Sequence, residues 1–133
     1  MTKTRRKKRI LQEQEKRERR EKLTQEGRRL GFKTGEEYLL WKTLDGEGIK
    51  AKHNVEILGK EVDLFIMPNL IIEVGFLDDY EKMKHETFKK HGYNILHFPN
   101  ELIYNKEILR KHTVEMIKRA VSSSSFVINM HDR

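Results

Sequence analysis

The sequence predicts an α/β domain with a mixed sheet, preceded by a basic helical arm. Four short apolar segments have the length and flanking turn residues of strands: about 53–58, 61–67, 70–76 and 93–98. Three further segments have apolar residues at helical spacing: about 34–44, 78–91 and 105–121. Behind the arm, the predicted order is therefore helix, three strands, helix, strand, helix.

Positive charge is concentrated in the first 35 residues, which hold 14 Lys/Arg against 5 Glu, while the rest holds 14 against 16. This segment lacks a sustained apolar heptad but has acid-to-base pairs at i,i+4, which predict a solvent-exposed helix. Such an arm indicates a polyanion partner, most often nucleic acid; a solvated tail that aids solubility is the alternative. The residues expected to contact nucleic acid are Arg5, Arg6, Lys7, Lys8, Arg9, Arg17, Arg19 and Arg20.

Length and composition limit the class of protein. A chain of 133 residues holds one compact domain with extensions, which we divide into an arm (1–33), a folded domain (34–121) and a flexible tail (122–133). No cysteine is present, which excludes disulfides, thiolate zinc sites and cysteine nucleophiles. No long apolar stretch or signal peptide is recognisable, so we expect an intracellular, nucleoid-associated protein without a membrane partner.

Local signals support each element in the first half of the domain. Thr34 followed by Glu37 has the form of a capping box, and the helix that it starts ends near residues 45–48. Residues 59–60 are predicted to form the tight turn of a hairpin between the first two strands. The third strand, 70–76, is nearly all apolar and is predicted to be central in the sheet.

The second half continues the pattern. Asp78 and Asp79 lie at the start of the middle helix, and Gly92 follows its end. Because this helix connects the third and fourth strands, the two strands are predicted to be parallel. The last helix, 105–121, precedes a serine run that is predicted to be flexible.

Two acids interrupt apolar strands, Asp63 in the second strand and Glu73 in the third. The strands are joined by a short turn, so the two carboxylates can converge at one end of the sheet. A buried carboxylate needs a cation, a basic partner or a proton, and two together favour a hard divalent cation such as Mg²⁺. A salt bridge to a helix lysine, or a solvent-facing Asp63, would equally explain the pattern.

The segments "GEEYLLWKTL", "VDLFI", "IIEV" and "NILHFPNEL" resemble, in their order and spacing, the PD-(D/E)XK nuclease superfamily. The likeness spans about residues 36–120 and is greatest to the branch of very-short-patch-repair endonucleases and their small bacterial and phage relatives. The resemblance implies a restriction-endonuclease-like αβββαβ core and cleavage of DNA that depends on Mg²⁺, for which Mn²⁺ can substitute. It implies Asp63 and Glu73 as metal ligands. Glu37 matches a helix glutamate that can assist the metal, or is simply a capping acid.

The sequence departs from this family where the superfamily has a lysine two residues after the glutamate. That position is Gly75 here, and the histidine that often follows in this branch is absent as well. Lys84 shares a helical face with Phe88 and could supply the missing cation, more readily than Lys82; a solvated lysine is the alternative. Asp78 could add a metal ligand or stabilise the helix dipole, and His97 could contact phosphate or pack in the core.

These features predict a metal-dependent DNA endonuclease with Asp63, Glu73, Lys84 and Glu37 as its catalytic residues. In this interpretation, metal-activated water attacks phosphorus, and the arm adds affinity through phosphates with little sequence information. The alternatives are a nuclease-derived DNA-binding protein that has lost catalysis, and a resolvase of branched DNA. Strong sequence specificity would require a homodimer or a partner protein.

Overall fold

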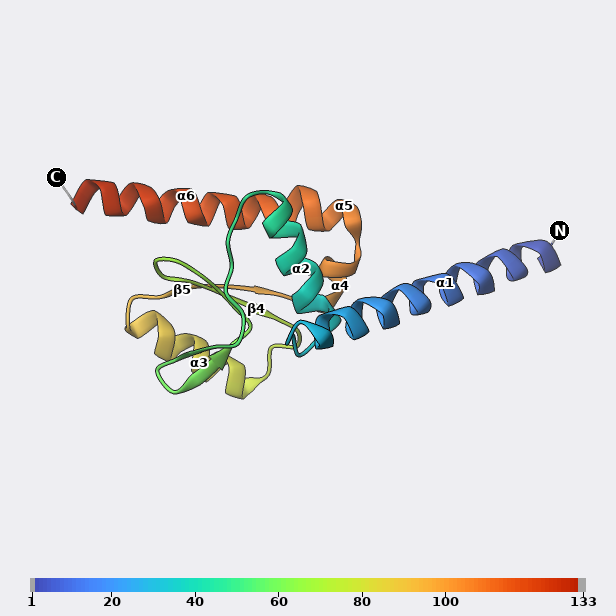
Figure 1. The fold of residues 1–133 in the computed structure, drawn as a ribbon, viewed down its shortest axis with the longest axis horizontal. Coiled ribbons are helices and arrows are strands. Elements are labelled where there is room, and N and C mark those ends of the chain that lie inside the picture. The colour runs from blue at the N-terminus through green and yellow to red at the C-terminus, as the bar shows by residue number, and fades with distance from the viewer. Residues whose placement is uncertain (1, 132–133) are drawn as a thin grey trace.

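A computed structural model describes the backbone of residues 2–131 and the side chains of residues 4–122. The helices and strands, in chain order, are α1 (Thr2–Arg29), α2 (Gly35–Gly46), β1 (Val55–Ile57), β2 (Lys60–Val62), β3 (Leu64–Ile66), β4 (Leu70–Val74), α3 (Asp79–Lys90), β5 (Asn94–Phe98), α4 (Asn100–Tyr104), α5 (Lys106–Ile108), a π-helical segment η1 (Leu109–Thr113) and α6 (Val114–His131). The predicted α/β class, mixed sheet and long N-terminal helix are confirmed (Figure 1).

The main sheet has the strand order β3-β4-β5, so the predicted third strand is central. β3 pairs antiparallel with β4, and β4 pairs parallel with β5, as expected for two strands joined through a helix. Figure 1 shows α3 on one side of this sheet and α2 and α6 on the other. The sheet is therefore the middle layer of the domain.

Side chains alternate across the central strand because successive residues of a strand point to opposite faces. Leu70 and Ile72 join the larger core beneath α2 and the C-terminal helices. Ile71 faces the other way and packs with Phe88 of α3. This alternation places Glu73 on the same face as Ile71, toward α3.

The predicted hairpin exists, but its second strand was predicted too long. Leu58 and Gly59, at φ +55° and +75°, form the turn between β1 and β2, one residue earlier than predicted. The segment 61–67 is broken at Asp63 into β2 and β3, which belong to different sheets. The carboxylate of Asp63 accepts a hydrogen bond from the Val74 N–H at 2.8 Å, in place of a backbone carbonyl of a continuous strand. Asp63 therefore lies at a bend rather than within a strand.

The predicted cap of α2 at Thr34 is present, and α3 also begins at a side-chain cap, Asp78. The Thr34 hydroxyl accepts from the Glu37 N–H at the start of α2, and the Asp78 carboxylate accepts from the Glu81 N–H at the start of α3. These bonds satisfy N–H groups that have no partner within the helix. They also fix the residue at which each helix begins.

The C-terminal region differs from the single helix predicted over 105–121. The segment "PNEL" forms the start of α4 rather than only a turn, and Asn105 then caps α5 through its side chain. Beyond η1, α6 continues through the serine run to His131, because no Gly or Pro ends the helix there. The predicted tail is thus helical as far as His131, and residues 132–133 lie outside the described part of the chain.

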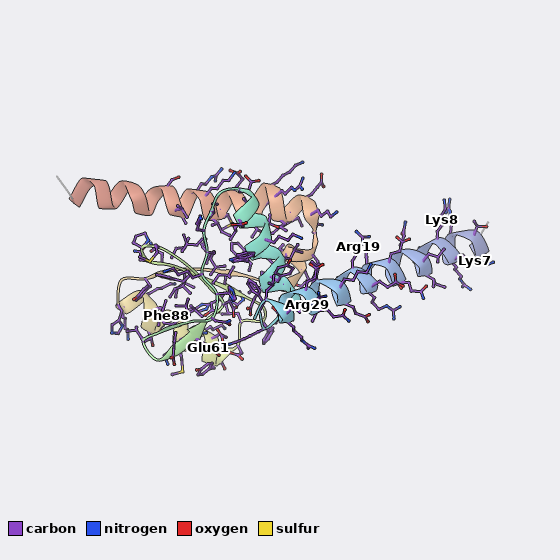
Figure 2. The ribbon with its side chains drawn as sticks, viewed as in Figure 1. Lys7, Lys8, Arg19, Arg29, Glu61 and Phe88 are labelled. Atoms are coloured by element: carbon purple, nitrogen blue, oxygen red, sulfur yellow. The ribbon has the colours of Figure 1, made fainter. Side chains whose placement is uncertain are left out.

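Helix α1 extends away from the domain, and its basic side chains radiate from it in several directions (Figure 2). Its last turns are attached to the domain, since Leu23 packs against the core and Tyr38 donates a hydrogen bond to Glu26. Phe32, just beyond the helix, is buried and stacks on His53 at 3.9 Å between ring centroids. In the part of the chain that the structure describes, no helix combines the length and apolar character that spanning a membrane requires.

Candidate active site

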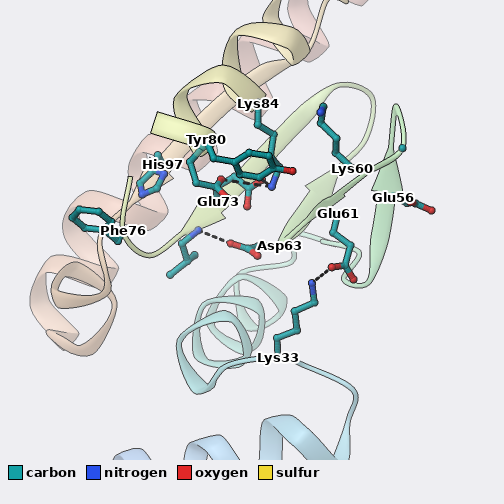
Figure 3. Close-up of a pocket in the computed structure, with 13 residues that line it drawn as sticks. Lys33, Glu56, Lys60, Glu61, Asp63, Glu73, Phe76, Tyr80, Lys84 and His97 are labelled. Carbon is teal, nitrogen blue, oxygen red and sulfur yellow. Dashed lines mark hydrogen bonds and ion pairs between the residues drawn. The ribbon is translucent and has the colours of Figure 1, made fainter. Parts of the chain in front are cut away.

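A polar hollow of about 510 Å³ opens at the end of the central strand (Figure 3). Its walls come from the β1–β2 hairpin, the bend at Asp63, the end of β4 and the first turns of α3. Asp63, Glu73 and Lys84 all line it, together with His97 from β5. The structure thus brings three of the four predicted catalytic residues into one pocket.

Strand register explains why these residues meet. In the antiparallel pair, Leu64 lies opposite Ile72, so the next step along the same register brings Asp63 opposite Glu73. In the parallel pair, Glu73 lies beside His97. A row of polar residues therefore crosses the end of an otherwise apolar sheet, and the predicted convergence of the two acids follows from the pairing.

Glu73 and Lys84 form a buried ion pair. The Nζ atom of Lys84 lies 2.7 Å from Oε1 of Glu73, and the two side chains are only 9% and 4% exposed. Lys84 reaches the sheet because it shares a face of α3 with the core residue Phe88, one turn further along. The structure places Lys82 on the exposed face of the same helix.

Glu37 joins this group from the other side of the sheet edge. It lies in the first turn of α2, where the Thr34 cap holds its backbone, and it is 6% exposed. Burial, then the charge of Asp63 and a hydrogen bond to it, raise the pKa of Glu37 to about 8. The contribution of Asp63 to this shift, which is second to burial, places the two carboxyl groups near each other.

Glu73 has the same electrostatic character. Burial and the proximity of Asp63 raise its pKa to about 8, although the ammonium group of Lys84 acts in the opposite direction. Burial also disfavours the charge on Lys84, but attraction to Glu73, Glu81 and Asp63 outweighs it and raises the lysine pKa. Glu37 and Glu73, which are buried beside Asp63 with one buried cation, therefore retain protons near neutral pH unless more positive charge enters.

Gly75 explains why the lysine does not come from the strand. Its φ of +124° is a backbone conformation that residues with a side chain rarely adopt. The Gly75 N–H donates to the Phe98 carbonyl at 3.0 Å, which holds the chain in this turn as it leaves β4. A Cβ atom would meet no close neighbour, so the backbone angle rather than lack of space disfavours lysine there.

A second cluster of ligand-type side chains was missed in the sequence. Glu73, Glu81 and His85 each offer one ligand atom, and these atoms lie within 4.8 Å of one another. Glu81 and His85 stand one turn apart on α3, at the i,i+4 spacing that puts two side chains on one helix face. That spacing is the signal for this pair that the sequence offers.

The other predicted residues divide between structural and surface positions. Asp78 caps α3, so its helix-stabilising role is the one that the geometry supports. The Nε2 atom of His97 contacts the Gly75 carbonyl oxygen, and its ring lies 5.5 Å from that of His85. His97 therefore holds the turn after β4 and lines the pocket at the same time.

The basic residues named in the arm are all exposed on α1. Arg19 and Arg20 line a second hollow between α1, α2 and the C-terminal helices, where the Arg20 guanidinium lies 4.4 Å from the centre of the Tyr104 ring. Further lysines and arginines that line this hollow, here called the basic groove, are Lys16, Lys22, Lys42, Lys106 and Arg110. Three glutamates also line it, so its net charge is positive.

Comparison with known proteins places the fold. No family model matches the chain, and neither does any curated protein. Among solved structures, the chain is similar to the catalytic domain of the homing endonuclease I-Bth0305I, with a TM-score of 0.54 and 18% sequence identity. The likeness covers 63% of this chain and 90% of that one. The chain therefore has the fold of a nuclease catalytic domain, while its assignment to the PD-(D/E)XK branch stays a prediction.

Proposed function

We propose that this chain is a metal-dependent DNA endonuclease that hydrolyses phosphodiester bonds. The observation that carries the proposal is the meeting of Asp63, Glu73 and Lys84 in one pocket, next to Glu37. The pocket lies at the end of the central strand of a fold shared with an endonuclease catalytic domain. A site that combines clustered carboxylates with a buried lysine suits chemistry on a negatively charged phosphate.

The residues present fit a divalent cation. Asp63 and Glu73 would hold Mg²⁺, or Mn²⁺ in its place, and Glu37 would act as an outer ligand. The raised pKa values of Glu37 and Glu73 support this. They show that the negative charges of these buried, crowded carboxylates are not fully balanced by positive charge nearby, and a bound cation would supply that balance. Oε1 of Glu73 is buried and has no hydrogen-bond donor in line with it among the described residues, although Lys84 lies close.

The side chains of the site have distinct roles in this proposal. When bound, a divalent ion would polarise the phosphate and acidify a water molecule. Lys84 would stabilise the negative charge that develops on the phosphate oxygens, at low cost in reorganisation because it is already held in place. The hydrogen bond from the Val74 N–H fixes the orientation of the Asp63 carboxylate.

DNA would be held by the arm and the basic groove. Exposed lysines and arginines on α1 suit contacts with phosphates, which add affinity but little sequence information. The basic groove would extend this surface from Arg19 and Arg20 onto the domain through Lys42, Lys106 and Arg110. The substrate would then contact both the protruding helix and the body of the protein.

The main alternative is a nuclease-derived DNA-binding protein that has lost catalysis. It is supported by the absence of the superfamily's lysine at position 75. The buried Lys84 beside Glu73 favours the enzyme over this alternative, because a cation is present where the chemistry would need it. A resolvase would have the same site and differ only in the DNA structure that it prefers.

The direct test is cleavage of supercoiled, linear, single-stranded and four-way-junction DNA in Mg²⁺ or Mn²⁺, beside the Glu73→Gln variant. We expect wild-type protein to cut at least one substrate and the variant to cut none while still binding DNA. Preference for the junction would identify the resolvase. Binding without cutting in both metals, unchanged by Glu73→Gln, would support the non-catalytic alternative and overturn the proposal.

A further inference from the structure

We infer that Glu73, Glu81 and His85 form a second divalent-cation site, one that selects a first-row transition ion such as Mn²⁺ over Mg²⁺. The inference deepens the proposed function and rests on it for the role of Glu73, which both sites would share. Neither the sequence motifs nor the resemblance assigns Glu81 or His85 a function. The site follows from their position in the folded chain.

The geometry is close to that of a metal site. One ligand atom from each of the three side chains lies within 4.8 Å of the other two. Ligands of a transition ion stand about 2.0–2.2 Å from it, so two ligands of one ion lie at most about 4.4 Å apart. A small rotation of the Glu81 side chain, which is 25% exposed, would close the remaining distance.

One buried polar atom of the cluster, Nε2 of His85, lacks a hydrogen bond among the described residues. Nε2 of His85 is buried, and its nearest acidic atom, Oε2 of Glu81, stands 3.9 Å away, beyond hydrogen-bonding distance. Glu73 is 3% exposed, and its Oε1 atom lies against the ammonium group of Lys84, at 2.7 Å. Leaving the buried nitrogen of His85 unpaired costs free energy, and a cation shared with Glu73 and Glu81 would satisfy it.

A positive charge, the ammonium group of Lys84, already lies close to both acids of the cluster. Its Nζ atom lies 2.7 Å from Glu73 and 3.6 Å from Oε2 of Glu81, which are the two acids of the cluster. The ammonium group therefore competes with a metal ion for these carboxylates. Removal of that ammonium group should make the cluster bind a metal ion more tightly.

The ligand set decides which ion is preferred. Two carboxylates with one imidazole nitrogen suit Mn²⁺ and later first-row ions, whereas Mg²⁺ is held by oxygen ligands and keeps several waters. Because Glu73 also faces Asp63, an ion in the cluster would lie next to the proposed Mg²⁺ ligands. Two neighbouring ions can stabilise the attacking and the leaving oxygens of one displacement.

The test uses the full chain without DNA and Mn²⁺ alone as the probe. Pulsed electron paramagnetic resonance detects a nitrogen atom bound to Mn²⁺ through its nuclear modulation. We expect this nitrogen signal in wild-type protein, and we expect it to be lost in His85→Gln. Outer-shell partners alone are worth about 10–100-fold in metal affinity, so loss of the Glu81 ligand in Glu81→Gln should weaken Mn²⁺ binding at least tenfold. Lys84→Met should strengthen it.

Two control variants make the result specific. His91→Gln changes an exposed histidine on the same helix and should keep the nitrogen signal. Asp63→Asn removes a proposed Mg²⁺ ligand and should abolish cleavage but keep the signal, so failure of the proposed function and failure of this inference can be distinguished. No nitrogen signal in folded wild-type protein, or one that persists in His85→Gln or disappears in His97→Gln instead, would overturn the second site.

Discussion

The Nζ atom of Lys84 lies 2.7 Å from Oε1 of Glu73, in a contact between helix α3 and the central strand β4. In the superfamily that the sequence resembles, the corresponding cation would come from the strand itself, two residues after the glutamate. Here that position is Gly75, the residue after the end of β4, whose backbone conformation disfavours a lysine. The helix therefore supplies a buried lysine that the strand does not.

Substitution of Lys84 by Met is expected to abolish DNA cleavage while DNA binding persists. The change removes a buried positive charge that would otherwise stabilise the reacting phosphate, and losses of about 10²–10³-fold are typical for one such group. Nicking of supercoiled plasmid in Mg²⁺ measures the effect, beside anisotropy of labelled DNA for binding. Lys82→Met, on the exposed face of the same helix, is the matched control and should keep wild-type activity. Full activity in Lys84→Met would remove this residue from the mechanism.

A lysine introduced at position 75 is not expected to restore the family pattern. Gly75→Lys should lower the free energy of unfolding by about 1–3 kcal/mol, because φ of +124° strains any residue with a Cβ atom. Urea unfolding followed by the fluorescence of the single tryptophan, Trp41, measures this loss. Gly75→Ala serves as the control for the backbone effect alone and should show a similar loss. Stability equal to wild type in both variants would contradict the strain argument.

Asp63→Asn should keep the fold but lose cleavage. The amide oxygen of Asn can still accept the hydrogen bond from the Val74 N–H, so the bend between β2 and β3 is preserved. The negative charge that a divalent cation needs is lost. Circular dichroism should therefore match wild type, while plasmid cleavage falls by at least about 10²-fold. An unfolded variant would show that the charge of Asp63 supports the bend itself.

Without added metal, the protein should become less stable as pH rises from about 5 to 8. Glu37 and Glu73 have pKa values of about 8 in the folded chain against 4.5 for the ordinary side chain, so the folded state binds more protons across this range. The free energy of unfolding then falls with rising pH. The raised pKa of Lys84 acts only at more alkaline pH, outside this range.

Urea unfolding at pH 5.5 and 8.0 tests this prediction. Glu37→Gln removes one of the titrating groups and should reduce the dependence on pH. Saturating Mg²⁺ should counteract the loss at pH 8, since a metal bound to the folded state requires ionised carboxylates. An identical pH dependence in wild type and Glu37→Gln would show that this carboxyl does not titrate as described.

Removing the positive charges from the N-terminal end of α1 should reduce the salt dependence of DNA affinity. Replacement of Arg5, Arg6, Lys7, Lys8 and Arg9 by Ala leaves the last turns of α1 intact, where Leu23 packs on the core. Each lost phosphate contact lowers the slope of log K against log salt by about 0.9. Fluorescence anisotropy between low and high salt measures the slope. Lys89→Ala/Lys90→Ala, at the end of α3, is the surface control. An unchanged slope in the arm variant would show that this part of the arm makes no phosphate contacts with DNA.

Much of the fold could be predicted from the sequence because its signals are local. Thr34 and Asp78 mark helix starts through hydrogen bonds that each makes within three residues. The apolar run around Ile72 indicates a central strand, since both of its faces must be buried. The length of α3 between two strands indicates a parallel pair. The break at Asp63 could not be read in this way, because it depends on Val74, eleven residues further along the chain.

The sequence by itself determined the α/β class, the basic arm and two acids, Asp63 and Glu73, whose place in apolar segments predicted a shared site. Only the tertiary structure decided which cation faces them and what else stands nearby. Lys84 is one of several lysines on α3, and its burial depends on how that helix packs against β4. Glu81 and His85 become ligand candidates only because the same packing brings Glu73 of β4 close to both of them. Contacts between distant segments, which local propensity does not encode, made that choice.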